Sequence, residues 1–219
     1  QGRRAKTDPM DAAVLTQYGC TFHPRVTPPT SPQQQRLADW SQRRRQRIHT
    51  LTVETNRAEH HADAFCQRQA RQLRRLLAKP IEQCNQAITQ LIAADALLAH
   101  KARRLDAIPG VGPVVAATVL AEMPELGSLN RQTAAALAGV APYHRDSGAQ
   151  NGIRRISGGR RPVRCALYMA TWSAIRHDRI LISACGPPEE TAVAITACMR
   201  KLVILINPLL KNPNCSLAH

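Results

Sequence analysis

The stretch that decides the fold is LDAIPGVGPVVAATVLAEM, residues 105–123. An apolar helix end is followed by the turn IPGVG at 108–112, and a second helical run begins at Pro113. Proline is favoured at the first position of a helix, and glycine permits the positive φ that tight turns need. We therefore predict two helices joined by a turn in which Gly110 and Gly112 permit positive φ and leave the tip free of side chains.

This turn has the pattern of a helix-hairpin-helix. Backbone N–H groups at the turn, together with the N-terminus of the next helix, form an anion-binding concavity for a DNA phosphate. Contacts of that kind position the duplex and do not read its sequence. We predict that Gly110, Val111 and Gly112 contact DNA, and the alternative is an ordinary tight turn between two helices.

Upstream of this motif, the sequence predicts a long helical hairpin. From Gln34 to about Arg104 there is no glycine, and Pro80 is the only proline. Apolar residues recur three and four positions apart, which is helix periodicity. We predict helices over 34–57 and 60–98, packed antiparallel in a coiled-coil-like manner, with Pro80 kinking or breaking the second. The run RRRQR at 43–47 favours a solvated helix face.

The predicted fold is mainly α, with a compact helical domain at 105–212 that contains the helix-hairpin-helix. Strands are expected only as short segments flanking 140–158. The other predicted regions are the N-terminal segment 1–22, a Pro-rich linker at 23–33, the helical hairpin at 34–104 and a tail at 213–219.

The composition favours a nucleic-acid partner. Lys and Arg number 30 against 15 acids, which gives a formal charge of +15. Such an excess most often serves phosphate binding. No run of eighteen apolar residues predicts a membrane span. The seven cysteines form no CxxC pair, which favours reduced thiols over a zinc site or a disulfide framework. A cytoplasmic, nucleoid-associated protein is expected.

A second informative stretch is RDSGAQNGIRRISGGRRPVR, residues 145–164, which holds six arginines and two serines. A solvated loop is one interpretation, and a serine nucleophile aimed at a phosphate is the other. A serine hydroxyl needs activation by a base or a metal, and arginines stabilise the anionic transition state of phosphoryl transfer. Ser147 and Ser157 are the two candidate nucleophiles.

Several segments, in order along the chain, resemble one protein family: AKTDPMDAAVL, PGVG, AGVAPYHRDSG, GIRRISGGRRPVRCALYMA and ITACMRKL. This succession resembles the insertion-sequence transposases of the IS116/IS110/IS902 family. The resemblance implies a RuvC-like α/β domain with four acids that bind Mg²⁺, a helical linker, and a C-terminal domain with a serine nucleophile. It also implies a phosphoserine link to DNA and a structured guide RNA.

The resemblance also assigns roles to individual residues. Ser147 matches the nucleophile and is favoured over Ser157. Asp8 and Asp11 match the last two metal-binding acids, although the sequence alone favours an N-cap with a first-turn acid. Segment 1–22 would then be the end of the RuvC-like domain. The predicted DNA-binding arginines are Arg145, Arg154, Arg155, Arg160, Arg161 and Arg164.

The chain departs from the family pattern in two places. The first two acids of the metal site are not in this sequence, and the segment at 180–190 is shortened relative to the family. We expect a truncated copy with doubtful activity. One alternative is a non-catalytic helix-hairpin-helix DNA-binding module. Another is an oligomerisation fragment, and we expect a homodimer or tetramer formed through the helical hairpin.

Overall fold

The computed structural model describes residues 7–24, 29–60, 62–143, 155–177 and 192–212. It is mainly helical, as predicted. The chain divides into two compact units, Gln1–Ser31 and Pro32–His219, and each is described by itself.

The first unit contains α1, Asp8–Phe22. Its N-cap is Thr7, so Asp8 is the first helical residue and not the predicted cap. No residue of α1 is buried, and the rings of Tyr18 and Phe22 lie 4.9 Å apart on its surface.

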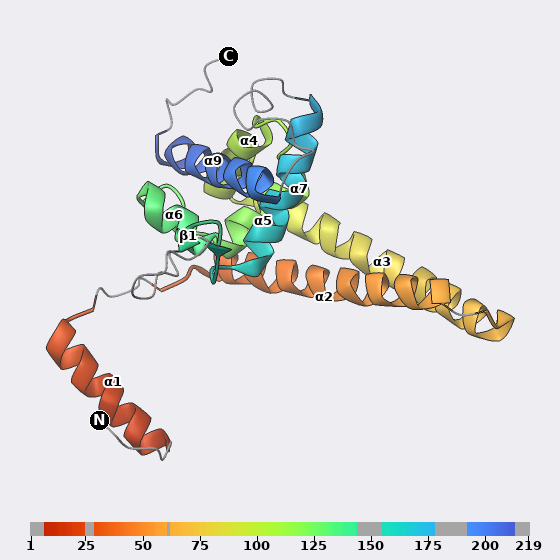
Figure 1. The fold of residues 1–219 in the computed structure, drawn as a ribbon, viewed down its shortest axis with the longest axis horizontal. Helices are drawn as coiled ribbons and strands as arrows, with labels where there is room; N and C mark the ends of the chain where they lie inside the picture. The colour runs from red at the N-terminus through yellow and green to blue at the C-terminus, as the bar shows by residue number, and fades with distance from the viewer. Residues whose placement is uncertain (1–6, 25–28, 61, 144–154, 178–191, 213–219) are drawn as a thin grey trace, which may run out of the picture. The chain divides into compact units, whose positions relative to one another are not determined.

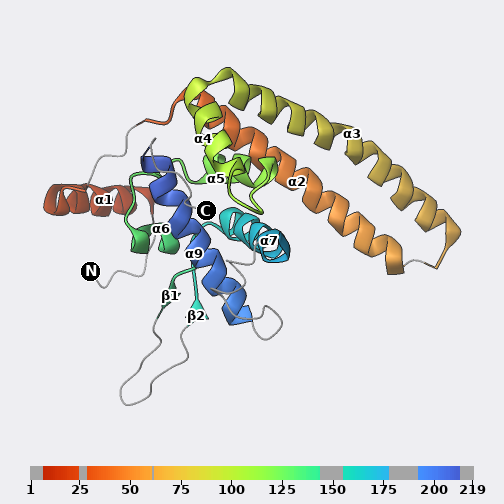
Figure 2. The ribbon, with the colours of Figure 1, turned by 90° about the horizontal axis from the view of Figure 1, so that it is seen from above.

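The second unit begins with the predicted helical hairpin, formed by α2, Pro32–His60, and α3, Ala64–Ala94 (Figures 1 and 2). Pro80 lies inside α3 and does not end it. The helix ends instead at Asp95, a break that the sequence analysis missed. The Asp95 carboxylate accepts hydrogen bonds from the N–H groups of Leu97 and Leu98, and it thereby starts α4, Ala96–Asp106.

The arginine run at 43–47 joins helices, so the prediction of a solvated face is wrong for three of its arginines. Arg44 Nε donates to Asn85 Oδ1 on α3 at 2.5 Å. Arg45 pairs with Glu122 on α5, Pro113–Glu122. Arg47 Nη1 donates to the Pro80 carbonyl at 2.8 Å. These contacts hold α2 against α3 and α5.

The rest of this unit packs α5 with α6, Arg131–Leu137, α7, Arg161–His177, and α9, Ala192–Lys211. The strands β1, Pro142–Tyr143, and β2, Arg155–Ile156, form an antiparallel pair. These are short strands at the two flanks where the sequence allowed them.

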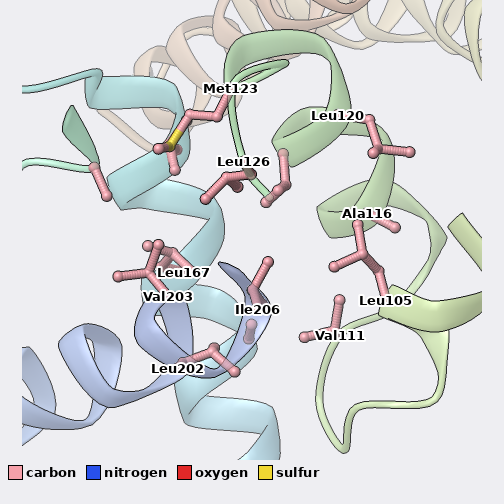
Figure 3. Packing of buried hydrophobic residues seen from close by; sticks show 14 of the residues in the cluster. Leu105, Val111, Ala116, Leu120, Met123, Leu126, Leu167, Leu202, Val203 and Ile206 are labelled. Carbon is pink, nitrogen blue, oxygen red and sulfur yellow. The ribbon is translucent and has the colours of Figure 1, made fainter. Parts of the chain in front are cut away.

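The core lies where α5, α7 and α9 meet the turn after α4 (Figure 3). Leu105, Val111 and Leu120 approach it from α4, the turn and α5, while Leu167 of α7 and Ile206 of α9 approach it from the other side. Buried alanines let helix backbones approach closely, and these include Ala116, Ala134, Ala135, Ala138 and Ala170. The low aromatic content therefore serves close helix packing.

Among the described residues, α9 is the helix long and apolar enough to cross a membrane by length and composition. The sequence analysis predicted no such segment. Its apolar residues Leu202, Val203 and Ile206 are buried against other helices, as in a core helix of a globular domain. Asn207, also buried, accepts from Gly127 N–H at 2.9 Å and donates to the Leu129 carbonyl at 2.7 Å.

Four cysteines carry free thiols, in keeping with the prediction: Cys20, Cys66, Cys84 and Cys165. Cys198 is disulfide-bonded, so the prediction of reduced thiols is wrong for this residue.

Candidate nucleic-acid interface

We call the segment 144–154 the serine loop, and the strands that flank it in sequence, β1 and β2, pair with each other. Pro142 pairs with Ile156 and Tyr143 with Arg155 in antiparallel register. Ser147, Arg145 and Arg154 lie outside the described residues, between these strands in sequence. The pairing fixes the base from which that segment leaves and returns.

A contact between glycines supports this base. Gly139 ends α6 with φ +72°, and its N–H donates to the Ala136 carbonyl at 3.0 Å. A Cβ on Gly159 would lie 2.2 Å from the Gly139 nitrogen, closer than any side chain allows. Two backbones therefore cross where only glycine fits. The glycines of the SGG sequence hold the return end of the loop against α6.

Arg160 forms an internal ion pair that the sequence analysis did not foresee. Its Nη1 and Nη2 donate to Glu125 Oε2 and Oε1 at 2.7 and 2.6 Å, and Nη1 also donates to the Glu122 carbonyl at 2.5 Å. The hydrogen bonds from Arg160 lower the pKa of Glu125, and those to Glu125 raise the pKa of Arg160. The guanidinium predicted to bind DNA is thus engaged within the protein. Its backbone N–H adds a bond to the Leu137 carbonyl at 2.7 Å.

Of the other predicted DNA-binding arginines that the structure describes, one supports the base of the loop and two are exposed. Arg164 Nη1 donates to the Gly158 carbonyl at 2.7 Å, so it holds the loop base. Arg155 and Arg161 are exposed, and neither guanidinium has a hydrogen bond or ion pair within the described part of the chain. These two remain available to a phosphate. Ser157, the rival nucleophile, is exposed after β2.

The turn between α4 and α5 joins two helices, as predicted. Gly110 has φ +83°, whereas Gly112 has φ −85° and extended geometry, so only Gly110 uses the conformational freedom of glycine. A Cβ on Gly110 would lie 2.4 Å from the Ala170 carbonyl oxygen, because the turn packs against α7. Gly110 is therefore needed for docking between elements as well as for its φ.

The turn offers fewer free N–H groups than the motif suggests. The Val111 side chain is buried, and its N–H donates to the Ile108 carbonyl at 3.0 Å. No acceptor among the described residues engages the N–H groups of Gly112 and Val114 at the start of α5. A phosphate could be bound there, at the positive end of the helix.

Asp8 and Asp11 both lie in the first turn of α1 and are exposed. Carboxylate oxygens are ligands that Mg²⁺ prefers, and residues three apart share a helix face. Their chemistry therefore fits part of a magnesium site. No group of three or more His, Cys, Asp or Glu residues in the described ranges could hold a metal ion.

A basic helical chain with exposed arginines beside a strand pair is typical of proteins that bind nucleic acids. Comparison with known proteins adds the following similarities. Residues 102–184 match the Transposase IS116/IS110/IS902 family, which confirms the resemblance seen in the sequence. Over this segment the chain is similar to that family.

Two curated relatives are similar to the chain over a longer range. They are the pilin gene-inverting proteins of Moraxella bovis and Moraxella lacunata, each 29% identical over 171 residues. The similarity covers 77% of this chain and 53% of each relative. The chain thus spans about half the length of the curated relatives it matches.

For some residues that support the base of the loop, no local sequence pattern indicates their role. Glu125 stands 35 positions from Arg160, and no local pattern marks it as the partner. Gly139 is the exception, because glycine after an alanine-rich helix is a common C-cap.

Proposed function

We propose that this chain acts in DNA transposition or recombination, with Ser147 as the nucleophile. The observation that carries the proposal is the family match over 102–184, which includes the serine loop and its hairpin base. The exposed guanidinium groups of Arg155 and Arg161 at the return end of the loop support it.

In the proposed step, Ser147 Oγ attacks a backbone phosphorus atom of DNA. An Oγ–P bond forms, the bond from phosphorus to one deoxyribose oxygen breaks, and that oxygen takes up a proton as the serine hydroxyl loses its own. The reverse attack by a deoxyribose hydroxyl rejoins the strand. Arginine side chains stabilise the extra negative charge on the phosphate in the transition state.

Asp8 and Asp11 would hold Mg²⁺ together with acids from other residues. A bound Mg²⁺ supplies charge stabilisation at the phosphate and lowers the pKa of a coordinated hydroxyl or water. We extend the proposal to two partners that the family resemblance implies. One is a structured guide RNA, and the other is a second copy of the chain bound through α2 and α3.

The hairpin has a surface suited to such association. Phe65 and Leu76 on α3 are 58% and 65% exposed, although both are large and apolar. They lie eleven positions apart and so on one face of the helix. Light scattering should show a dimer or tetramer that Leu76→Glu dissociates and the neighbouring exposed change Arg75→Glu does not.

The test of the catalytic proposal is covalent capture of DNA. The chain is incubated with end-labelled duplex DNA and Mg²⁺, and adducts that survive denaturing electrophoresis are counted. Ser147→Ala should abolish the adduct and leave duplex affinity unchanged, while Ser157→Ala should retain both. An adduct that persists in Ser147→Ala and disappears in Ser157→Ala would reverse the assignment.

The non-catalytic DNA-binding module is the second candidate, and the free N–H groups of Gly112 and Val114 favour it. It predicts duplex binding that falls steeply with salt, with no adduct from any variant.

A further inference from the structure

A cleft of about 390 Å³ lies where the helical hairpin meets α4 and α5. Its volume is in the range of small-molecule sites, roughly 300–1,000 Å³. The apolar part of its lining comes from Ile88 and Ile92 on α3 and from Ala116 and Ala117 on α5. Among the described residues, none of 155–164 lines it.

One wall carries the side chain of Ser41 on α2. The residue is 4% exposed as a whole, its hydroxyl is not among the fully buried unpaired atoms, and no hydrogen bond of its side chain is found within the described ranges. Thr89 and Thr118 line the same cleft but donate to the carbonyls of Asn85 and Val114 at 3.0 and 2.8 Å. The Ser41 hydroxyl therefore faces the cleft with its donor and acceptor sites open to a ligand.

Arg44 lies one turn along α2 on the same side and also lines the cleft. Its guanidinium is half-buried, and burial lowers its pKa despite an opposing interaction with Cys84. Asn85 orients it, because Oδ1 accepts from Arg44 Nε at 2.5 Å while Nδ2 donates to Glu82 Oε2 at 3.0 Å. Among the described residues no carboxylate lies within ion-pair distance of this guanidinium.

The other charged groups of the lining are Glu82, Arg103 and Asp106. Glu82 already accepts from Asn85 and from Gln86 Nε2 at 3.2 Å. The guanidinium of Arg44 keeps its terminal N–H donors for a ligand on this side of the cleft. Serine hydroxyls and arginine are common donors to phosphate oxygens, and the apolar lining suits a flat, weakly polar group.

We propose that this cleft binds a nucleotide, with the phosphate held by Ser41 and Arg44 and the base packed against Ile88, Ala116 and Ala117. The nucleotide is either free or one unit of a bound strand, and both share the same chemistry. The site uses none of the residues assigned to the serine chemistry, so it can be tested apart from the proposed function.

The experiment is calorimetric titration of the full chain with adenosine 5′-monophosphate, inorganic phosphate and adenosine in parallel. Saturable binding of one nucleotide per chain is expected, tighter than either fragment alone. Loss of one hydrogen bond to a charged group should weaken binding by about tenfold or more. We expect that loss for Ser41→Ala and for Arg44→Gln. The matched controls Thr52→Ala and Arg43→Gln change exposed residues of the same helix and should bind as the parent does.

Ser41→Ala removes no internal hydrogen bond, so its fold should be retained even if Arg44→Gln unfolds. The proposal is overturned if the nucleotide does not bind, if Ser41→Ala binds it unchanged, or if phosphate alone binds as tightly. Displacement of the nucleotide by single-stranded DNA of about 20 residues would assign the site to a strand, and lack of displacement to a free nucleotide. Covalent capture of duplex DNA by Ser147 is measured in a separate experiment, so the failure of one proposal does not affect the test of the other.

Discussion

Gly139 and Gly159 show how single residues fix the base of the serine loop. Their backbones cross at a separation that excludes any Cβ, and Arg164 holds the neighbouring Gly158 carbonyl at 2.7 Å. Gly158 and Gly159 have similar φ, +65° and +68°, but different surroundings. Comparing these two positions therefore separates the free-energy cost of positive φ from the free-energy cost of a steric clash.

We expect Gly159→Ala to destabilise the protein more than Gly158→Ala. A Cβ at Gly158 meets nothing within 4 Å, so alanine there loses stability only through the positive φ, by about 1 kcal/mol. At Gly159 the clash with Gly139 raises the loss to about 3 kcal/mol. Urea unfolding of both variants measures the difference, and equal losses would show that the two backbones do not touch.

Between elements, one ion pair joins the segment after α5 to the start of α7. The Arg160 side chain binds the Glu125 carboxylate through both oxygens and also reaches the Glu122 carbonyl. Both side chains are about one-third exposed, 32% for Arg160 and 39% for Glu125, so solvent screens the pair. Its contribution is then about 1 kcal/mol.

This pair gives a pH-dependent stability. Because the folded-state pKa of Glu125 is lowered, the stabilisation is present above the unfolded pKa of about 4.3 and is lost as pH falls through the folded value. Glu125→Gln should therefore cost about 1 kcal/mol at pH 7 and nothing near pH 2. Urea titrations across this range test it. Glu54→Gln, which breaks an i,i+3 pair with Arg57, is the control and should cost less at pH 7.

The turn between α4 and α5 offers a matched pair of glycines. We expect Gly110→Ala to destabilise by about 3 kcal/mol, since positive φ and a clash with Ala170 and Ala174 of α7 both act. Gly112→Ala should be tolerated, because its φ is −85° and a Cβ meets nothing within 4 Å. Thermal unfolding measures the stability of both variants. A Gly110→Ala variant as stable as the parent would mean that the turn does not dock on α7.

At the scale of the whole molecule, the two units of the chain differ in whether they bury a hydrophobic core. The unit Pro32–His219 holds the buried core, while α1 buries none of its residues. A chain of residues 32–219 should therefore unfold with the same Tm as the full chain. Calorimetry of both forms checks this, and a fall of several degrees would show that residues 1–31 stabilise the fold.

The sequence by itself determined the features that depend on local chemistry. Helix periodicity and the absence of glycine determined the α2–α3 hairpin, and PGVGP placed a turn between α4 and α5. The ordered motifs from DPMDA to ITACMRKL pointed to the transposase family, which the match over 102–184 confirmed. The roles of Ser147, Asp8 and Asp11 stay predictions.

Only the tertiary structure decided which charges and glycines meet. Arg44, Arg45 and Arg160 looked alike in sequence as basic residues, yet their partners Asn85, Glu122 and Glu125 lie 41, 77 and 35 positions away. The conformation of Gly112 and the cleft beside Ser41 likewise follow from packing between helices. Such contacts depend on which helix faces meet in space, and periodicity along one chain segment does not encode that choice.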